Sequence, residues 1–378
     1  MTQGTLNHIK LVLLIRSLDV GGAERQLVAL ARGAMALGHE VQVLTFYPGG
    51  VFREDLERAS VSVLSLDKFG RWDVAGFLLR LVRTLRQEKP ATLYCFLPTA
   101  NLVGLLAARL AGVPRVAWGV RASNVDLTQY DRLSRFEVWL TGKLARYAST
   151  IICNSDAGAA FHSILGYPED KMHVIQNGID TNRFCFDEVG RERLRLEWGL
   201  APTDLAIGLS ARLDPMKGHE TALRALALLR VDLPNVKLVC VGNGPLNASL
   251  RELSRQLKIE GQVIWAGAKS DMPSVYSAFD ISSSSSSYGE GFSNAIAEAM
   301  ACEKVCVVTD VGDSAMIVGE TGWIVPASSP EAIAEAWRHA LNLTAAERAT
   351  MGIHARQRII EKFSVKRMVK RTLDVLQG

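Results

Sequence analysis

Residues 288–301 read Tyr-Gly-Glu-Gly-Phe-Ser-Asn-Ala-Ile-Ala-Glu-Ala-Met-Ala and join a glycine-rich loop to the start of a helix. Before them come an apolar run with serines, Ser274 to Ile281, and then six serines at 282–287. The residues from Ala295 to Ala301 are strong helix formers without Gly or Pro. We therefore predict a strand end, a polar loop and a helix start, in that order.

This loop has the properties of an anion site. Gly289 and Gly291 let the backbone approach a ligand closely, and the free N–H groups near Phe292 to Asn294 carry partial positive charge. Glu290 precedes these donors, and Glu298 follows about one turn into the helix. A nucleotide-diphospho-sugar fits this frame, with its diphosphate on the helix start and a carboxylate accepting from hydroxyls at each end. Alternatively, one glutamate complements the helix dipole and the other lies on a solvated face.

A second loop carries two cations. Residues 211–218 read Ala-Arg-Leu-Asp-Pro-Met-Lys-Gly and follow a strand predicted at 205–210. Ligands of doubly wound sheets bind beyond the carboxyl ends of the strands, which is where Arg212 and Lys217 belong. Arginine supplies a planar fork and lysine a point charge, so the two can converge on one diphosphate. Two solvated loop charges are the alternative.

Strand and helix patterns alternate along the rest of the chain. Short continuous apolar runs predict buried parallel strands, and a helical apolar period predicts the helices between them. In the first half we expect strands at 9–15, 40–46, 61–66, 92–97, 115–120, 149–154 and 171–175, and helices at 23–37, 73–88, 100–111, 132–147 and 155–165. In the second half we expect further strands at 236–241 and 262–266 and helices at 218–230 and 245–257.

The length indicates two domains, because 378 residues are too many for one ordinary core. We expect a first Rossmann-like domain at 1–186, a second at 187–362, and a C-terminal helix at 363–378 that packs back on the first. The charged segment 187–200 is expected to connect the domains. The fold class is therefore α/β, with two doubly wound domains.

Five motifs together resemble one known family. They are Gly-Gly-Ala-Glu-Arg at 21–25, Gln-Asn-Gly-Ile-Asp at 176–180, the loop at 211–218, the Glu-x7-Glu pair within 290–302, and Gly-Trp-Ile-Val-Pro at 322–326. This combination is similar to the retaining glycosyltransferases of family 4, also called glycosyl transferases group 1, and it runs through nearly the whole chain. The resemblance implies the GT-B fold, whose two domains face a cleft that holds the active site.

The family's known residues carry over to matching positions. The resemblance implies that Arg212 and Lys217 bind the donor diphosphate, that Glu298 binds the ribose, and that Glu290 binds the transferred sugar. The predicted catalytic residues are Glu290, Arg212 and Lys217. The predicted donor-binding residues are Gly21, Gly22, Arg212, Lys217, Glu290, Gly291, Phe292, Ser293, Asn294 and Glu298. Arg121 and Asn124, just after a predicted strand, are placed on the acceptor side.

The implied reaction moves a hexose or N-acetylhexosamine from a nucleotide-diphospho-sugar of UDP or GDP type to a glycan or lipid-linked acceptor, in cell-envelope polysaccharide synthesis. Many members of the family have a His near Arg121, but this chain has none between His39 and His162. Front-face attack, in which the leaving phosphate takes the acceptor proton, needs no such base. No Asp-x-Asp is present, so we expect neither a metal nor another cofactor.

Other functions remain open. A GT-B phosphorylase or epimerase is the nearest alternative, although nothing marks the pyridoxal-phosphate lysine of a phosphorylase. A nicotinamide dehydrogenase would need a Gly-x-Gly-x-x-Gly after the first strand, which is missing, and Gly242-x-Gly244 is a weak phosphate signal that suits a tight turn. An inactive sugar-nucleotide binding protein is the third alternative, which the intact Arg212, Lys217, Glu290 and Glu298 disfavour.

Composition and charge address location and partners. No apolar run reaches the length of a membrane span, and residues 1–10 lack a signal-peptide core, so we expect a cytoplasmic protein. The six cysteines suit reduced core positions. Residues 1–186 with 363–378 carry a net charge of +8 against −4 for the rest. We therefore expect peripheral contact with the anionic inner face of the plasma membrane. The contact would be made by basic helices that include Arg80, Arg83, Arg86, Arg132 and Arg135. A solvated basic face is the alternative, and no nucleic acid partner is expected.

Overall fold

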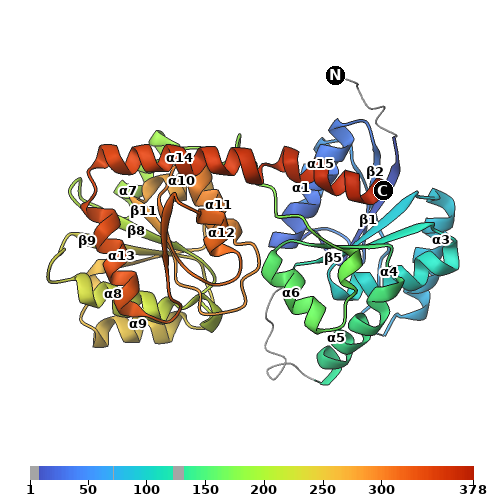
Figure 1. Ribbon diagram of the computed structural model, residues 1–378, viewed down its shortest axis with the longest axis horizontal. Coiled ribbons are helices and arrows are strands. Elements are labelled where there is room, and N and C mark those ends of the chain that lie inside the picture. The colour runs from blue at the N-terminus through green and yellow to red at the C-terminus, as the bar shows by residue number, and fades with distance from the viewer. Residues whose placement is uncertain (1–7, 71, 122–131) are drawn as a thin grey trace. The chain divides into compact units, whose positions relative to one another are not determined.

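The computed structural model describes residues 8–70, 72–121 and 132–378, and the chain forms two compact units (Figure 1). The first unit comprises residues 1–178 and 365–378, and the second unit comprises residues 179–364. Each unit is built on one parallel sheet with helices on its faces. Among the described residues, no helix combines the length and the apolar character that crossing a bilayer requires.

The sheet of the first unit has, within the described residues, seven strands in the order β3-β2-β1-β4-β5-β6-β7. Its central strands are nearly continuous apolar runs because helices cover both faces. The strands are β1 (Lys10–Ile15), β2 (Glu40–Thr45), β3 (Ser62–Ser65), β4 (Thr92–Phe96), β5 (Arg115–Val120), β6 (Thr150–Cys153) and β7 (Met172–Val174).

The helices of the first unit connect these strands in the doubly wound manner. The Ser155 hydroxyl accepts from the Gly158 N–H, which caps α6 as the sequence predicted. The helices are α1 (Gly22–Ala36), α2 (Arg53–Arg58), α3 (Ala75–Glu88), α4 (Pro98–Ala111), α5 (Arg132–Leu144), α6 (Asp156–Ile164) and α15 (Val365–Gln377), with short 3-10 turns η2 (Ala145–Tyr147) and η3 (Glu169–Lys171).

The last helix of the chain, α15, packs on the first helix (Figure 1). Val369 is buried, and it lies so close to Gly33 of α1 that a Cβ there would come within 2.5 Å of its Cγ2. Further along, the Thr92 hydroxyl bonds the Leu376 carbonyl at 3.3 Å. The C-terminal residues thus complete the core of the first unit.

The sheet of the second unit has, over the same described part of the chain, six strands in the order β10-β9-β8-β11-β12-β13. These are β8 (Leu205–Ser210), β9 (Val236–Val241), β10 (Val263–Gly267), β11 (Ile281–Ser284), β12 (Cys306–Thr309) and β13 (Gly322–Val325). The helices are α7 (Glu188–Glu197), α8 (His219–Leu229), α9 (Asn247–Gln256), α10 (Met272–Ala278), α11 (Asn294–Ala301), α12 (Ser314–Val318), α13 (Pro330–Asn342) and α14 (Ala345–Phe363), with 3-10 turns η4 (Pro215–Lys217) and η5 (Glu260–Gln262).

Two segments differ from the sequence-based prediction. The stretch 274–281, predicted as a strand, is mostly helix α10, and β11 begins only at Ile281. Residues 274–278 are all buried, so no helical period distinguishes them from a strand. The segment 187–200, predicted as a connector, holds α7, which packs on α10 inside the second unit.

The boundaries between the units also differ from those expected at residues 186 and 362. The chain crosses after Gly178 and after Ser364. Residues 179–186 belong to the second unit because the Ile179 N–H bonds the Phe363 carbonyl at 2.7 Å and Phe184 is buried in that core.

Candidate donor-binding site

The start of α11 stands beyond the carboxyl end of β11, where a doubly wound sheet binds ligands. The N–H groups of its first turn have no partners within the helix, as in any helix, and the Ser293 side chain does not cap them. Gly289 has a left-handed φ of 76°, and a Cβ there would lie 2.6 Å from the Met216 sulfur. The glycine is therefore needed both for the turn and for close packing against the loop after β8.

Lys217 and Glu290 form an ion pair at this helix start. Lys217 Nζ donates to Glu290 Oε1 at 2.6 Å, and the Ser286 hydroxyl donates to the same oxygen at 2.6 Å. The Glu290 side chain is only 8% exposed and that of Lys217 20%. Two residues that the sequence placed in one site therefore meet there.

The backbone holds the loops of Lys217 and Glu290 together. The Ser287 N–H bonds the Met216 carbonyl at 2.8 Å, and the Ser285 hydroxyl bonds the Lys217 carbonyl at 2.9 Å. Gly218 has a φ of 61°, and a Cβ there would meet the Ser285 carbonyl oxygen at 2.0 Å. Because β8 and β11 are neighbours in the sheet, their two loops form one rigid frame.

A small cavity adjoins the ion pair. It measures 20 Å³ and is lined by side chains that include Ser210, Lys217, Ser286 and Glu290. That volume suits about one water molecule and is far too small for a diphosphate. A donor would therefore bind outside this cavity, where its phosphates can compete with Glu290 for Lys217.

Arg212 lies on the same loop as Lys217 but points into solvent. Its side chain is 71% exposed, and its Nε is 3.7 Å from an oxygen of Asp214. The glycines of Gly242-x-Gly244 approach this loop closely, since Cβ atoms there would lie 2.1 Å from the Ala211 oxygen and 2.3 Å from the Leu213 oxygen. Both glycines serve backbone packing. The predicted convergence of Arg212 and Lys217 would need the arginine to turn.

Glu298 is buried rather than on a solvated face. Only 3% of the residue is exposed, and its carboxylate accepts from the Tyr276 hydroxyl at 3.0 Å. Tyr276 belongs to α10, which the sequence-based prediction gave as a strand, so this partner was missed. The Tyr276 hydroxyl therefore orients one oxygen of the Glu298 carboxylate, which lies on α11.

The remaining residues near α11 that were predicted to bind the donor form its entry turn. The Asp313 N–H bonds the Gly291 carbonyl at 3.2 Å, and Gly312, with a φ of 60°, approaches the Glu290 carbonyl. The Phe292 side chain is buried, with its ring centroid 5.4 Å from that of Phe363. Phe292 therefore serves the core, and only its backbone is suited to a ligand. Ser293 and Asn294 begin the helix.

His219, the first residue of α8, was not predicted as part of the site. It is 1% exposed, and neither ring nitrogen has a hydrogen-bond partner among the described residues. Burial, helped by the charge of Lys217, lowers the pKa of His219 to about 4. The imidazole is therefore neutral at physiological pH. Its place directly after Lys217-Gly218 is the signal that could have identified it.

The first unit holds the other predicted site residues. Gly21 is extended, with φ −164°, and precedes α1 at the carboxyl end of β1; Gly22 is the first residue of that helix. Arg121 Nη1 donates to the Asn177 side chain at 2.7 Å, and its guanidinium lies 4.8 Å from the centre of the Phe96 ring. Arg121 thus supports the turn at 176–180. Asn124 lies outside the described residues.

No group of three or more His, Cys, Asp or Glu is arranged to hold a metal ion within residues 8–70, 72–121 and 132–378. The expected independence of metal stays a prediction.

Two family profiles match this chain. The profile "Glycosyltransferase Family 4" matches residues 20–183, and "Glycosyl transferases group 1" matches residues 190–358. Together they take in most of both units, including the loops after β8 and β11.

Named relatives agree with these profiles. EpsF of Bacillus subtilis is 30% identical over 207 residues, or 54% of this chain and 53% of its own length. The D-inositol 3-phosphate glycosyltransferase of Jonesia denitrificans is 28% identical over 345 residues, covering 83% of this chain and 81% of the relative. The UDP-Gal:alpha-D-GlcNAc-diphosphoundecaprenol alpha-1,3-galactosyltransferase of Escherichia coli is 25% identical over 250 residues, 64% of each chain. The chain thus spans about half to four-fifths of these relatives.

A solved structure is similar over the full length. Anabaena HepE, in complex with UDP and glucose, superposes with a TM-score of 0.85 at 24% identity, covering 98% of this chain and 100% of HepE. The predicted GT-B fold of two Rossmann-like domains is confirmed.

Proposed function

Because the chain belongs to glycosyltransferase family 4 and has the GT-B fold, we propose that it transfers a hexose or N-acetylhexosamine from a UDP- or GDP-sugar to a glycan or lipid-linked acceptor. The new linkage keeps the anomeric configuration of the donor. The Escherichia coli relative, named for a diphosphoundecaprenol-linked acceptor, supports a role in cell-envelope polysaccharide synthesis.

The observation that carries this proposal is the Lys217–Glu290 pair at the start of α11. The Lys217 ammonium is balanced by a buried carboxylate. A diphosphate on the helix start brings negative charge to the same place, so Lys217 transfers its contact from Glu290 to the phosphates. Glu290 then becomes available to accept from a hydroxyl of the sugar, which couples donor binding to sugar positioning.

The bond rearrangement needs charge stabilisation above all. The bond between the anomeric carbon and the diphosphate oxygen breaks, the acceptor oxygen bonds that carbon on the same face, and the acceptor proton passes to the leaving phosphate. Lys217, Arg212 and the N–H groups of α11 stabilise the departing diphosphate, which makes a divalent metal unnecessary. Arg212 is exposed enough to turn toward the phosphates.

Glu298 suits the ribose of the donor. Tyr276 orients its carboxylate from one side, and burial strengthens hydrogen bonds to hydroxyl groups because water competes less. This supports assigning base-side binding to Glu298 and sugar-side binding to Glu290.

The surface of the first unit supports an acceptor held at a membrane. With the structure's boundaries, that unit holds 24 Lys and Arg against 16 Asp and Glu, a net charge of +8. Helix α5 exposes Arg135, Phe136, Trp139 and Lys143; the two aromatic residues are 54% and 57% exposed and their rings stack at 5.7 Å. Aromatic and basic side chains on one face suit the interface of an anionic bilayer.

The basic row expected on α3 contributes less than the sequence suggested. Arg80 is ion-paired with Asp73 and bonds the Leu66 carbonyl, and Arg86 bonds the Leu110 carbonyl. Arg132 lies among residues whose side chains are not described. Helix α5 is therefore the better candidate for membrane contact.

Sedimentation with vesicles tests this contact. We expect binding to phosphatidylglycerol-containing vesicles at low salt, weaker binding at high salt, and a further loss in Trp139→Ser. Ile164→Ser, at another exposed apolar residue of the first unit, is the matched control. An absence of low-salt binding would end the membrane proposal.

The experiment that tests the function is transfer of radiolabelled sugar from a panel of UDP- and GDP-sugars to undecaprenyl-diphosphate-linked saccharides. We expect one donor class to yield product and Lys217→Met to abolish it. Lys237→Met, which removes a half-buried lysine from β9 whose ammonium donates to the Gly261 carbonyl, should keep activity. Nucleotide binding without transfer from any donor would favour an inactive sugar-nucleotide binding protein.

A further inference from the structure

A second polar cluster of the second unit lies at the opposite edge of its sheet from Glu290. Asp280 directly precedes β11, and Glu303 and Lys304 lie just before β12. The strands are parallel, so their amino ends share one edge, whereas the loop of Glu290 follows a carboxyl end. The cluster is therefore separate from the proposed donor site.

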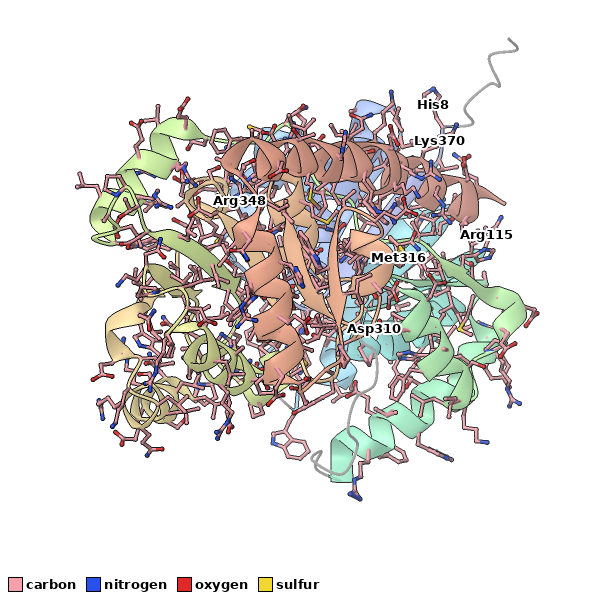
Figure 2. The ribbon with its side chains drawn as sticks, turned by 60° about the vertical axis from the view of Figure 1, so that its left-hand side comes forward. His8, Arg115, Asp310, Met316, Arg348 and Lys370 are labelled. Carbon is pink, nitrogen blue, oxygen red and sulfur yellow. The ribbon has the colours of Figure 1, made fainter. Side chains whose placement is uncertain are left out.

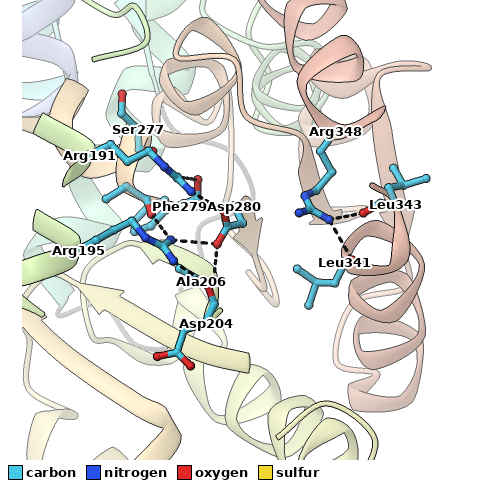
Figure 3. Close-up of polar contacts among 11 residues, drawn as sticks. Arg191, Arg195, Asp204, Ala206, Ser277, Phe279, Asp280, Leu341, Leu343 and Arg348 are labelled. Carbon is cyan, nitrogen blue, oxygen red and sulfur yellow. Dashed lines mark hydrogen bonds and ion pairs between the residues drawn. The ribbon is translucent and has the colours of Figure 1, made fainter. Parts of the chain in front are cut away.

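These residues line a pocket of 270 Å³. Its walls come from α7, the two strand starts and the first turns of α14, and they include Phe186, Arg191, Asp280, Lys304, Ala345 and Arg348. Figure 2 shows Arg348 near the start of α14. Figure 3 shows Arg191 and Arg195 on the Asp280 carboxylate, with Arg348 held separately by the carbonyl oxygens of Leu341 and Leu343.

The negative charge of Asp280 is already shared. Arg191 bonds one of its oxygens at 2.7 Å, and the other oxygen receives Arg195 at 3.0 Å and the Ala206 N–H at 2.7 Å. Burial disfavours ionisation, but Arg191, this N–H group and Arg195 outweigh it, and the pKa of Asp280 is lowered. Glu303 lies 4.0 Å from Arg356, so it too has a cation of its own.

Lys304 is compensated more weakly, by the charges of Asp280 and Glu303 without direct contact. The residue is 8% exposed, and among the described residues it has no carboxylate within ion-pair distance. Its Nζ lies 4.7 Å from the centre of the Phe186 ring. Burial, aided by the charge of Arg191, lowers the pKa of Lys304 to about 8. The pocket therefore contains an ammonium on a largely buried side chain that has no direct carboxylate partner among the described residues.

The end of helix α11 places Lys304 in the pocket. Glu303 has a left-handed φ of 62°, a conformation that non-glycine residues rarely adopt. Its carbonyl lies directly beneath α14, since a Cβ at Gly352 would come within 2.1 Å of the Glu303 oxygen. The conformation belongs to the end of α11, where the Glu303 N–H bonds the Met300 carbonyl and the Lys304 N–H bonds the Ala299 carbonyl, both at 3.0 Å.

We propose that this pocket binds the phosphate group of a small molecule, independently of the sugar donor. Lys304 supplies the point charge, and Arg191 and Arg348 supply further N–H donors from separate elements. The pocket of 270 Å³ accommodates a phosphate with a small organic group. Ala345, Ala349 and Phe186 provide an apolar wall for that group.

Calorimetric titration with inorganic phosphate and with glycerol 3-phosphate, at constant ionic strength in chloride, tests this site. We expect one binding event for the full-length protein, at least tenfold weaker in Lys304→Met and retained in Lys304→Arg. Lys217→Met should keep it, which separates this pocket from the donor site, and Lys237→Met is the matched lysine control. If glycerol 3-phosphate binds more tightly than inorganic phosphate, the apolar wall contacts its glycerol group. If the two bind with equal affinity, free phosphate is identified as the ligand.

Folding of Lys304→Met is checked by its melting temperature, which should not fall because the change removes a buried charge. If the variant does not fold, phosphorus NMR line broadening on the wild-type protein replaces it: broadening that persists with saturating nucleoside diphosphate supports the pocket. The proposal is overturned if phosphate does not bind the wild-type protein, if Lys304→Met leaves the affinity unchanged, or if Lys217→Met abolishes binding.

Discussion

Removing the Lys217 ammonium should expose how strongly the donor site depends on its ion pair. Lys217→Met keeps the length of the side chain and leaves the Glu290 carboxylate, 8% exposed, without its cation. At the observed 2.6 Å, unit charges attract by about 6 kcal/mol for an effective dielectric constant of about 20, and desolvation of the two groups offsets much of this. Breaking a buried pair costs about 3–5 kcal/mol, and since Lys217 is 20% exposed we expect the lower end, about 3 kcal/mol.

A double-mutant cycle isolates this interaction. Glu290→Gln alone should cost about 1 kcal/mol, because its amide oxygen still accepts from Ser286 and Lys217 can reach water. Lys217→Met with Glu290→Gln leaves neither charge unbalanced, so the double variant should lose only about 2 kcal/mol and the coupling should be about 2 kcal/mol.

Urea unfolding followed by tryptophan fluorescence measures these free energies. The effect should be confined to the transition of the second unit, which contains the pair. Lys237→Met, in the same unit, should change that transition by less than about 0.5 kcal/mol. If the effects of the two single substitutions simply add, with a coupling below about 0.5 kcal/mol, the Lys217–Glu290 pairing is refuted. The proposed transfer of Lys217 from Glu290 to the donor phosphates is then refuted as well.

Three other predictions follow. Arg212→Ala should lower turnover at least about a hundredfold in the transfer assay while leaving the melting temperature unchanged, since its side chain is exposed; near-normal activity would remove it from the diphosphate site. Turnover should survive EDTA, and inhibition that a divalent metal reverses would contradict the metal-free mechanism. The pKa of His219 is about 4 in the folded protein and 6.5 for the free side chain. The contribution of the neutral imidazole to the free energy of unfolding is therefore complete above pH 6.5 and is lost as the pH falls toward 4. When the pH falls from 7 to 4.5, the free energy of unfolding should therefore decrease by about 2.5 kcal/mol less in His219→Leu than in the wild type. Equal decreases in the two proteins would count against a buried neutral imidazole.

Much of the fold follows from local sequence patterns. Buried parallel strands read as continuous apolar runs, and so the predicted β1, β8 and β9 agree with the structure to within one residue. Helix α10 could not be found in this way, because it is buried on every side and its serines bond to nearby groups, as Ser277 does to the Pro273 carbonyl. Apolar character without a period does not distinguish a helix from a strand.

The residues of the candidate site were predicted from the sequence, but their contacts were not. Spacing and residue type indicated Lys217, Glu290 and Glu298, because cations and carboxylates around a helix start suggest a diphosphate sugar. That Lys217 pairs with Glu290 and that Tyr276 orients Glu298 depends on tertiary packing between segments about 20 to 70 residues apart. The burial of Phe292 against Phe363 has the same origin, since no local pattern brings α14 to this loop.

The most direct test of the central claim is calorimetric titration of the wild type, Glu298→Gln and Glu290→Gln with UDP and GDP. Both changes preserve side-chain volume, and Tyr276→Phe serves as the control for the buried contact of Glu298. We expect the wild type to bind one of the two nucleotides, Glu298→Gln to bind it at least about tenfold more weakly because a charged acceptor is lost, and Glu290→Gln to bind it normally. Binding of neither nucleotide, or equal losses in both variants, would contradict a donor site built on the start of α11.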